Sequence, residues 1–174
     1  PMISGRLQYY SKFSKSLSFD ALTSVITCGA NDDILQEDKP FSISAWIYPK
    51  SAGEGGAGRI IEKGTGIGGV LFITIATATL QFNVSGTTTL IRKSSDNSIV
   101  FNTWQHVLMT WDGSVTAANS RIYVDGLETG YQTTTDGATP TENSANTIRI
   151  GANSAASRTF YGLIDHVYVW NRIL

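Results

Sequence analysis

Carboxylates and histidines are the first side chains to consider as catalytic groups. A retaining glycosidase needs two carboxyl groups about 5 to 5.5 Å apart, which on a strand means acidic residues at alternate positions. The Asp and Glu residues of this chain instead stand beside predicted turns or singly on strands. Gln105 and His106 are adjacent, so their side chains are expected on opposite faces of a strand, unable to act on one atom. These residues predict no enzyme activity, because no acid and base converge.

A second chemistry is the stacking of aromatic rings on the apolar faces of sugars. In the run FSISAWIYP, Trp46 and Tyr48 alternate with apolar residues and therefore share one face. Trp104 and His106 share a face of the run WQHVLMTW in the same way. If both pairs lie on the concave sheet, they form a carbohydrate-binding platform. The alternative is that these rings fill the core or pack under a loop.

A carboxylate near the end of the chain is a candidate metal ligand. Asp165 stands in a strand pattern whose neighbouring positions, Ile164, Val167 and Val169, are apolar. A carboxylate in such surroundings needs hydrogen-bond donors or a cation. The oxygen ligands that the chain offers suit calcium, which is therefore the predicted cofactor. The alternative is that Asp165 accepts backbone N–H groups.

Strands must position these side chains, because no segment shows the i, i+3, i+4, i+7 pattern of an amphipathic helix. Charged residues make up only 16% of the chain and glycines number 17, a balance typical of half-buried strands joined by tight turns. About a dozen short strands predict an all-β antiparallel sandwich or barrel. The predicted strands are residues 16–20, 23–28, 41–49, 59–63, 69–76, 79–84, 88–93, 104–111, 120–125, 147–151 and 160–170.

Glycine-rich segments separate the predicted strands. Asp112-Gly113 and Asp125-Gly126 each follow an alternating run and predict turns. Residues 64–69 (GTGIGG) match G-x-G-x-x-G, but a strand pattern follows where a dinucleotide site requires a helix, so a turn is predicted. Residues 51–58 and 129–146 are small and polar, and we expect them to be long surface loops.

Size and charge limit the classes of partner. The 174 residues predict one compact domain. A net charge of -1 argues against nucleic acid and anionic membranes, and the one cysteine, Cys28, excludes an internal disulfide. No apolar run approaches the roughly 20 residues of a membrane span, so no membrane insertion is expected. Residues 1–15 lack the apolar core of a signal peptide.

Six segments together carry a family resemblance: SLSFD, PFSISAWIYP, WQHVLMTWDGS, RIYVDG, TIRIG and YGLIDHVYVWNRIL. In this order they resemble the laminin G-like branch of the concanavalin A-like lectin/glucanase superfamily, over residues 16–174. The resemblance implies an antiparallel jelly-roll β-sandwich of two curved sheets, one concave and one convex. It also implies a structural calcium ion held by Asp165, with Asp20 and loop carbonyls near Asp38 as further ligands. The alternative for Asp20 is an ordinary turn.

Residues 1–15 precede the first strand of this resemblance and are predicted to form an N-terminal arm or a first edge strand. As an arm, they would contact a partner subunit through Tyr9, Tyr10 and Phe13. We expect a non-enzymatic carbohydrate-binding or adhesive recognition module, extracellular or on a virion surface, whose partner is a glycan or polysaccharide. The alternative is a structural surface protein, such as a viral capsid or tail decoration subunit, with the jelly roll as scaffold.

Overall fold

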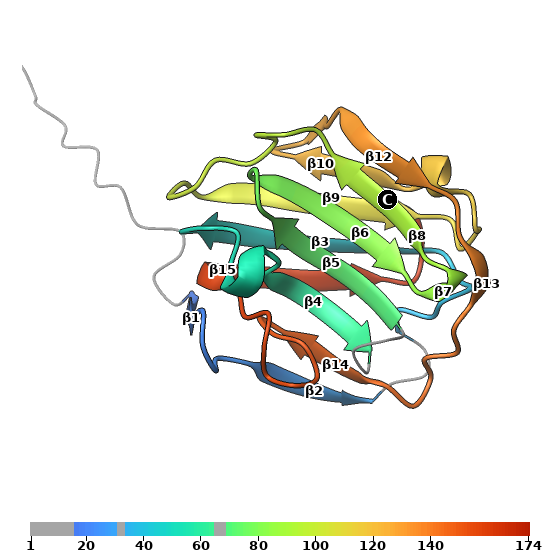
Figure 1. The fold of residues 1–174 in the computed structure, drawn as a ribbon, viewed down its shortest axis with the longest axis horizontal. Coiled ribbons are helices and arrows are strands. Elements are labelled where there is room, and N and C mark those ends of the chain that lie inside the picture. Colours follow the sequence, from blue (N-terminus) through green and yellow to red (C-terminus); the bar gives the residue numbers. More distant parts are fainter. Residues whose placement is uncertain (1–15, 31–33, 65–68) are drawn as a thin grey trace, which may run out of the picture.

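The chain folds as an antiparallel β-sandwich, seen in a computed structural model that describes residues 16–30, 34–64 and 69–174 (Figure 1). Residues 1–15, with the predicted arm, lie outside this range. Sheet A has the strand order β1-β15-β3-β9-β10-β11 and sheet B the order β12-β8-β6-β5-β4-β14-β2. Figure 1 looks through sheet B onto sheet A, and a small third sheet pairs β13 with β7. The predicted all-β jelly-roll architecture is confirmed.

The strands have the following bounds. Sheet A contains β1 (Leu17–Asp20), β15 (Tyr161–Trp170), β3 (Phe41–Pro49), β9 (Gln105–Trp111), β10 (Arg121–Val124) and β11 (Leu127–Glu128). Sheet B contains β12 (Tyr131–Thr135), β8 (Leu90–Ser94), β6 (Thr79–Val84), β5 (Gly69–Ile75), β4 (Arg59–Gly64), β14 (Thr147–Ile150) and β2 (Ile26–Ala30). The third sheet contains β7 (Gly86–Thr88) and β13 (Ala138–Pro140).

The core fills the space between the two large sheets. Alternate residues of β3 and β9, such as Ile43 and Met109, point inward and are fully buried. Phe41 of β3 lies between Trp111 of β9 and Phe82 of β6, at ring-centroid distances of 5.2 and 5.9 Å. These edge-to-face rings join the sheets, and the opposite faces of β3 and β9 point away from the core.

The segment 129–146 contains structure that its sequence did not predict. We expected one long loop, but the segment contains two strands, β12 and β13. β12 pairs with β8, and β13 pairs with β7. The strand YQTTT is polar on both faces, so it lacks the apolar alternation that marks a half-buried strand. It forms at the edge of sheet B, where backbone pairing and the β propensity of Tyr and Thr are sufficient. The loop expectation was wrong there.

The predicted turns are confirmed where the structure describes them. Asp125 and Gly126 have φ of 50° and 83° and join β10 to β11, as a two-residue hairpin loop of type I′ requires. Gly64 pairs with Gly69, and the strand β5 rather than a helix follows the glycine-rich segment, whose residues 65–68 lie outside the described residues. The described residues contain two 3-10 turns, η1 (Glu54–Gly56) and η2 (Ala117–Asn119), and no helix that could cross a membrane.

A β-bulge interrupts the last strand, β15. Asp165 pairs with Trp46 and Tyr168 with Ser44, so three steps on β15 oppose two on β3. The extra residue is His166, whose φ of 48° lies in the left-handed region within a strand. Val167 packs against the core, so Asp165, His166 and Tyr168 all point outward. Before the bulge the odd-numbered residues of β15 point outward, and after it the even-numbered residues do.

Candidate functional site

The four predicted sugar-binding residues lie together on the outer surface of sheet A. Trp46 of β3 is directly opposite His106 of β9, and their ring centroids are 5.5 Å apart. Tyr48 of β3 and Trp104, which precedes β9, form a second pair at 5.7 Å. All four side chains are half-buried and none belongs to the core. The alternative that they fill the interior of the sandwich is therefore excluded.

The bulged strand extends this surface. His166 and Tyr168 have ring centroids 6.2 Å apart, and Tyr168 and Trp170 lie 5.7 Å apart. Tyr168 pairs with Ser44 and Trp170 with Ser42, so these rings flank the small serine side chains of β3. We call the resulting surface the aromatic face; it consists of Trp46, Tyr48, Trp104, His106, His166, Tyr168 and Trp170.

Asp165 does not lie in the apolar environment that its neighbours predicted. The bulge turns it to the aromatic face, opposite Trp46, with its side chain 21% exposed. Its Oδ1 accepts the backbone N–H of His166 at 2.8 Å and lies 3.0 Å from His166 Nδ1. The observed role is thus that of a hydrogen-bond acceptor, the alternative raised for this residue. The burial that argued for a cation at Asp165 is absent.

Asp20 has a local role at the end of β1. Its Oδ1 accepts the backbone N–H groups of Leu22, Thr23 and Ser24 at 2.9 to 3.1 Å. The N–H of Leu22, followed by those of Thr23 and Ser24, holds the pKa of Asp20 well below its ordinary value. Asp20 therefore organises its own turn.

The two predicted calcium ligands do not form a shared site. Asp20 pairs with Tyr161, four residues along β15 from Asp165, which corresponds to about 13 Å at the rise of a strand. In the ranges that the structure covers, no three His, Cys, Asp or Glu side chains gather as a metal would need. The residues present therefore do not fit an ion bridging Asp20 and Asp165.

The outer surface of sheet B has a different chemistry. The register aligns Lys93 of β8 with Gln81 of β6, Ile73 of β5 and Arg59 of β4 in one row. The next row aligns Asn83, Leu71, Glu62 and Arg149 of β6, β5, β4 and β14. We call this surface the polar face; its polar and charged members are Lys93, Gln81, Asn83, Arg59, Glu62 and Arg149.

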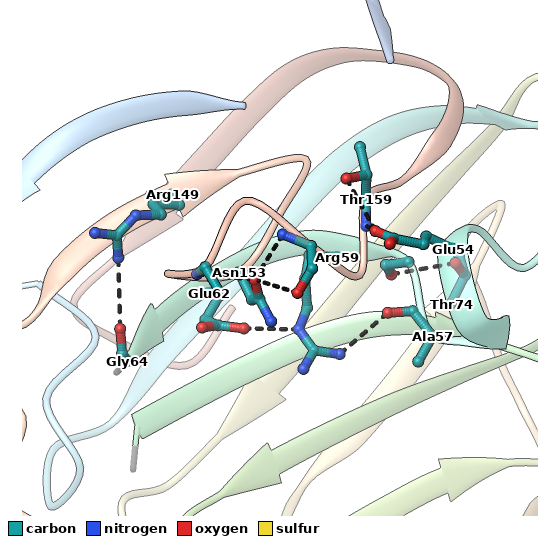
Figure 2. Close-up of polar contacts among 12 residues, drawn as sticks. Glu54, Ala57, Arg59, Glu62, Gly64, Thr74, Arg149, Asn153 and Thr159 are labelled. Carbon is teal, nitrogen blue, oxygen red and sulfur yellow. Dashed lines mark hydrogen bonds and ion pairs between the residues drawn. The ribbon is translucent and has the colours of Figure 1, made fainter. Parts of the chain in front are cut away.

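An ion pair anchors the polar face on β4 (Figure 2). Arg59 Nε donates to Glu62 Oε2 at 2.6 Å, and Arg59 Nη1 donates to the carbonyl of Ala57. The Glu62 side chain is 1% exposed and that of Arg59 13% exposed. Glu62 Oε1 is buried and has no hydrogen-bond partner among the residues described. Alternation did not predict this pair, because residues i and i+3 of a strand share a face only across a β-bulge, here the one between Arg59 and Ile61.

The segment after β14 is held next to this ion pair. Asn153 Oδ1 accepts the N–H groups of Ala155 and Ser157, which closes the turn that Figure 2 shows beside Arg59. Glu54 Oε2 accepts the N–H of Thr159 at 3.1 Å, and this bond ties the same segment to the loop before β4. The carbonyl of Arg158 also accepts the backbone N–H of Arg59 at 3.0 Å, so this segment lies directly beside the ion pair.

The two large antiparallel sheets define a jelly-roll β-sandwich of the lectin-like fold class. The family model described as the concanavalin A-like lectin/glucanases superfamily matches residues 23–174, and the chain belongs to this superfamily. A search of curated protein sequences found no match.

Solved structures share the fold at low sequence identity. The carbohydrate-binding module CBM40 of the Ruminococcus gnavus IT-sialidase, bound to α2,3 sialyllactose, has a TM-score of 0.66 and 10% identity over 91% of this chain and 90% of that one. The mouse laminin α1 chain domains LG4-5 have a TM-score of 0.63 and 12% identity over 88% of this chain, which spans 40% of theirs. The heptameric SAP-like pentraxin of Limulus polyphemus has a TM-score of 0.57 and 16% identity, over 91% and 76%.

Proposed function

We propose that this chain is a non-enzymatic carbohydrate-binding or adhesive recognition module and that its aromatic face is the glycan contact. The observation that carries the proposal is the convergence of Trp46, Tyr48, Trp104 and His106 on one outer surface, in two ring pairs 5.5 and 5.7 Å apart. The similarity to a module solved with sialyllactose supports a saccharide as the class of ligand.

The arrangement suits sugar rings for physical reasons. Indole and phenol rings offer flat apolar area for the C–H faces of a sugar and lose little conformational entropy on binding. Asp165 and His166, beside Trp46, supply an acceptor and an imidazole for sugar hydroxyl groups. Stacking thus provides affinity, and the Asp165–His166 pair provides orientation.

A polysaccharide array followed by titration tests this proposal. We expect the purified chain to bind at least one saccharide, and we expect Trp46→Ala and Tyr48→Ala each to weaken that binding about tenfold or more. Leu127→Ala is the matched control, since it removes a 76% exposed apolar side chain from the far edge of the same sheet. Unchanged affinity in both aromatic variants would refute the aromatic face as the contact.

Light scattering on the same sample separates the two functional classes. A monomer that binds glycan supports the recognition module, outside the cell or on a virion. A defined oligomer that binds no saccharide would instead support a structural surface protein, such as a viral capsid or tail decoration subunit. The predicted contact of residues 1–15 with a partner subunit belongs to that alternative, and removal of these residues should then abolish assembly.

A further inference from the structure

The charge of the polar face differs from that of the whole chain. Lys93, Arg59 and Arg149 are cationic there, and Glu62 is the one acid among the described outward residues of β8, β6, β5, β4 and β14. Three positive charges against one negative leave +2 on these strands, and Asp96, in the turn after β8, interacts electrostatically with Lys93 and reduces the sum to +1, on a chain whose net charge is -1. This sheet surface is therefore locally basic.

The cations of the polar face differ in how they are held. Arg59 is engaged with Glu62, whereas neither Lys93 nor Arg149 forms an ion pair with a described carboxylate. Arg149 Nη1 has only long contacts, 3.3 and 3.5 Å, to the carbonyls of Thr147 and Gly64. Both side chains are half-buried and remain accessible from solvent. Lys93 and Arg149 are thus positioned to pair with anionic groups of a ligand.

The half-buried side chains between these two cations suit a saccharide, whereas Ile73, Arg59 and Glu62 in the same rows are 3%, 13% and 1% exposed and offer little surface. Gln81 and Asn83 present amide groups that hydrogen-bond each other at 3.0 Å, and Leu71 provides partly exposed aliphatic surface beside them. Lys93 on β8 and Arg149 on β14 are separated by four strand spacings, about 19 Å across the sheet. Amides bind sugar hydroxyls, and a distance of this size is spanned by an oligosaccharide rather than a single small anion.

We propose that the polar face is a second binding surface, specific for saccharides that carry carboxylate or sulfate groups. Lys93 and Arg149 pair with the anionic groups, and Gln81 and Asn83 bind the hydroxyls between them. The inference extends the proposed carbohydrate-binding function to the other sheet, but it rests on residues that the aromatic face does not share. An experiment can therefore exclude one of the two binding surfaces without excluding the other.

The test measures binding of the full chain to heparin, polygalacturonate and neutral dextran at low and high salt. We expect an anionic polysaccharide to bind at low salt, to weaken at high salt and to bind more tightly than dextran. Heparin alone would identify sulfate as the recognised group, and polygalacturonate would identify carboxylate. The double variant Lys93→Gln/Arg149→Gln should lose about tenfold in affinity or more.

The control variants distinguish a site from a general charge effect. Lys39→Gln/Lys50→Gln removes the same two charges from exposed positions outside the polar face and should keep affinity within about twofold. Trp46→Ala tests the competing location: loss of this binding in Trp46→Ala, with full binding in the Lys93→Gln/Arg149→Gln variant, would place it on the aromatic face and overturn the proposal. Absence of binding to both anionic polysaccharides, or equal loss in the two double variants, would overturn the proposal. Tighter binding of a DNA oligonucleotide than of either polysaccharide would also overturn it.

Discussion

Removal of one partner of the Arg59–Glu62 pair should be among the most destabilising changes on the surface of sheet B. In Arg59→Met, the Glu62 carboxylate keeps its 1% exposure and loses the donor at 2.6 Å. Its other oxygen already has no partner among the described residues. Breaking a buried ion pair in this way costs about 3 to 5 kcal/mol, whereas replacing both charges with apolar groups is close to neutral. For a chain of this length, that loss lowers the melting temperature by about 6 to 20 °C.

Urea denaturation followed by circular dichroism measures this difference, with an unchanged m value as the check that the unfolded state is the same. The double variant Arg59→Met/Glu62→Met should recover most of the lost stability. Arg121→Met is the matched control, because the Arg121–Glu128 pair has side chains 56% and 34% exposed. Its removal should cost far less than the removal of Arg59, because water screens an exposed pair. A cost below about 1 kcal/mol for Arg59→Met, or no recovery in the double variant, would refute the reasoning.

Three further predictions concern single positions. Gly151→Ala should lower the melting temperature more than Gly126→Ala. Both glycines have positive φ, but a Cβ at Gly151 would lie 1.8 Å from the Phe19 ring, whereas one at Gly126 would meet open space. Equal decreases in melting temperature would contradict this packing. Hydrogen bonds depress the pKa of Asp20 in the folded chain, so the stability that the Asp20 carboxylate contributes is complete above about pH 4 and declines as the pH falls further. The difference in melting temperature between Asp20→Asn and wild type should therefore shrink from pH 6 to pH 2. A constant difference would argue against this role of Asp20. We expect calcium and chelator to give the same melting curve, since Asp165 accepts a backbone N–H and lies far from Asp20. A rise with calcium that Asp165→Ala abolishes would assign the ion predicted from the sequence.

Period-two alternation was sufficient to predict most of this fold. The pattern of FSISAWIYP predicted both faces of β3, and the structure confirms that Ile43 and Ile47 point into the core and Trp46 and Tyr48 away from it. Prediction failed where backbone geometry rather than composition decides. The polar strand β12 has no alternation to detect, and Lys63 is fully buried at the end of β4, a position where solvent exposure is the usual outcome for lysine.

The site was predicted only in part for the same reason. Trp46, Tyr48, Trp104 and His106 share their faces by simple alternation, so their convergence followed once β3 and β9 were neighbours. The bulge at His166 left no mark in the sequence, and without it Asp165 would share the face of Val167 and Val169. The polar face was missed because its two rows draw on β8, β6, β5, β4 and β14, whose register depends on long-range pairing.

The bulge also bears on how this surface can change during evolution. Upstream of His166 the even-numbered residue Ile164 faces the core, and downstream the odd-numbered residues Val167 and Val169 do. Deletion of His166 would remove the bulge and restore simple alternation along the whole of β15. One half of the strand would then have to exchange its inward and outward side chains. Point substitutions can vary the rings of the aromatic face one at a time. A single-residue deletion in β15 cannot be tolerated in this way, so within related chains the length of this strand should vary less than its composition.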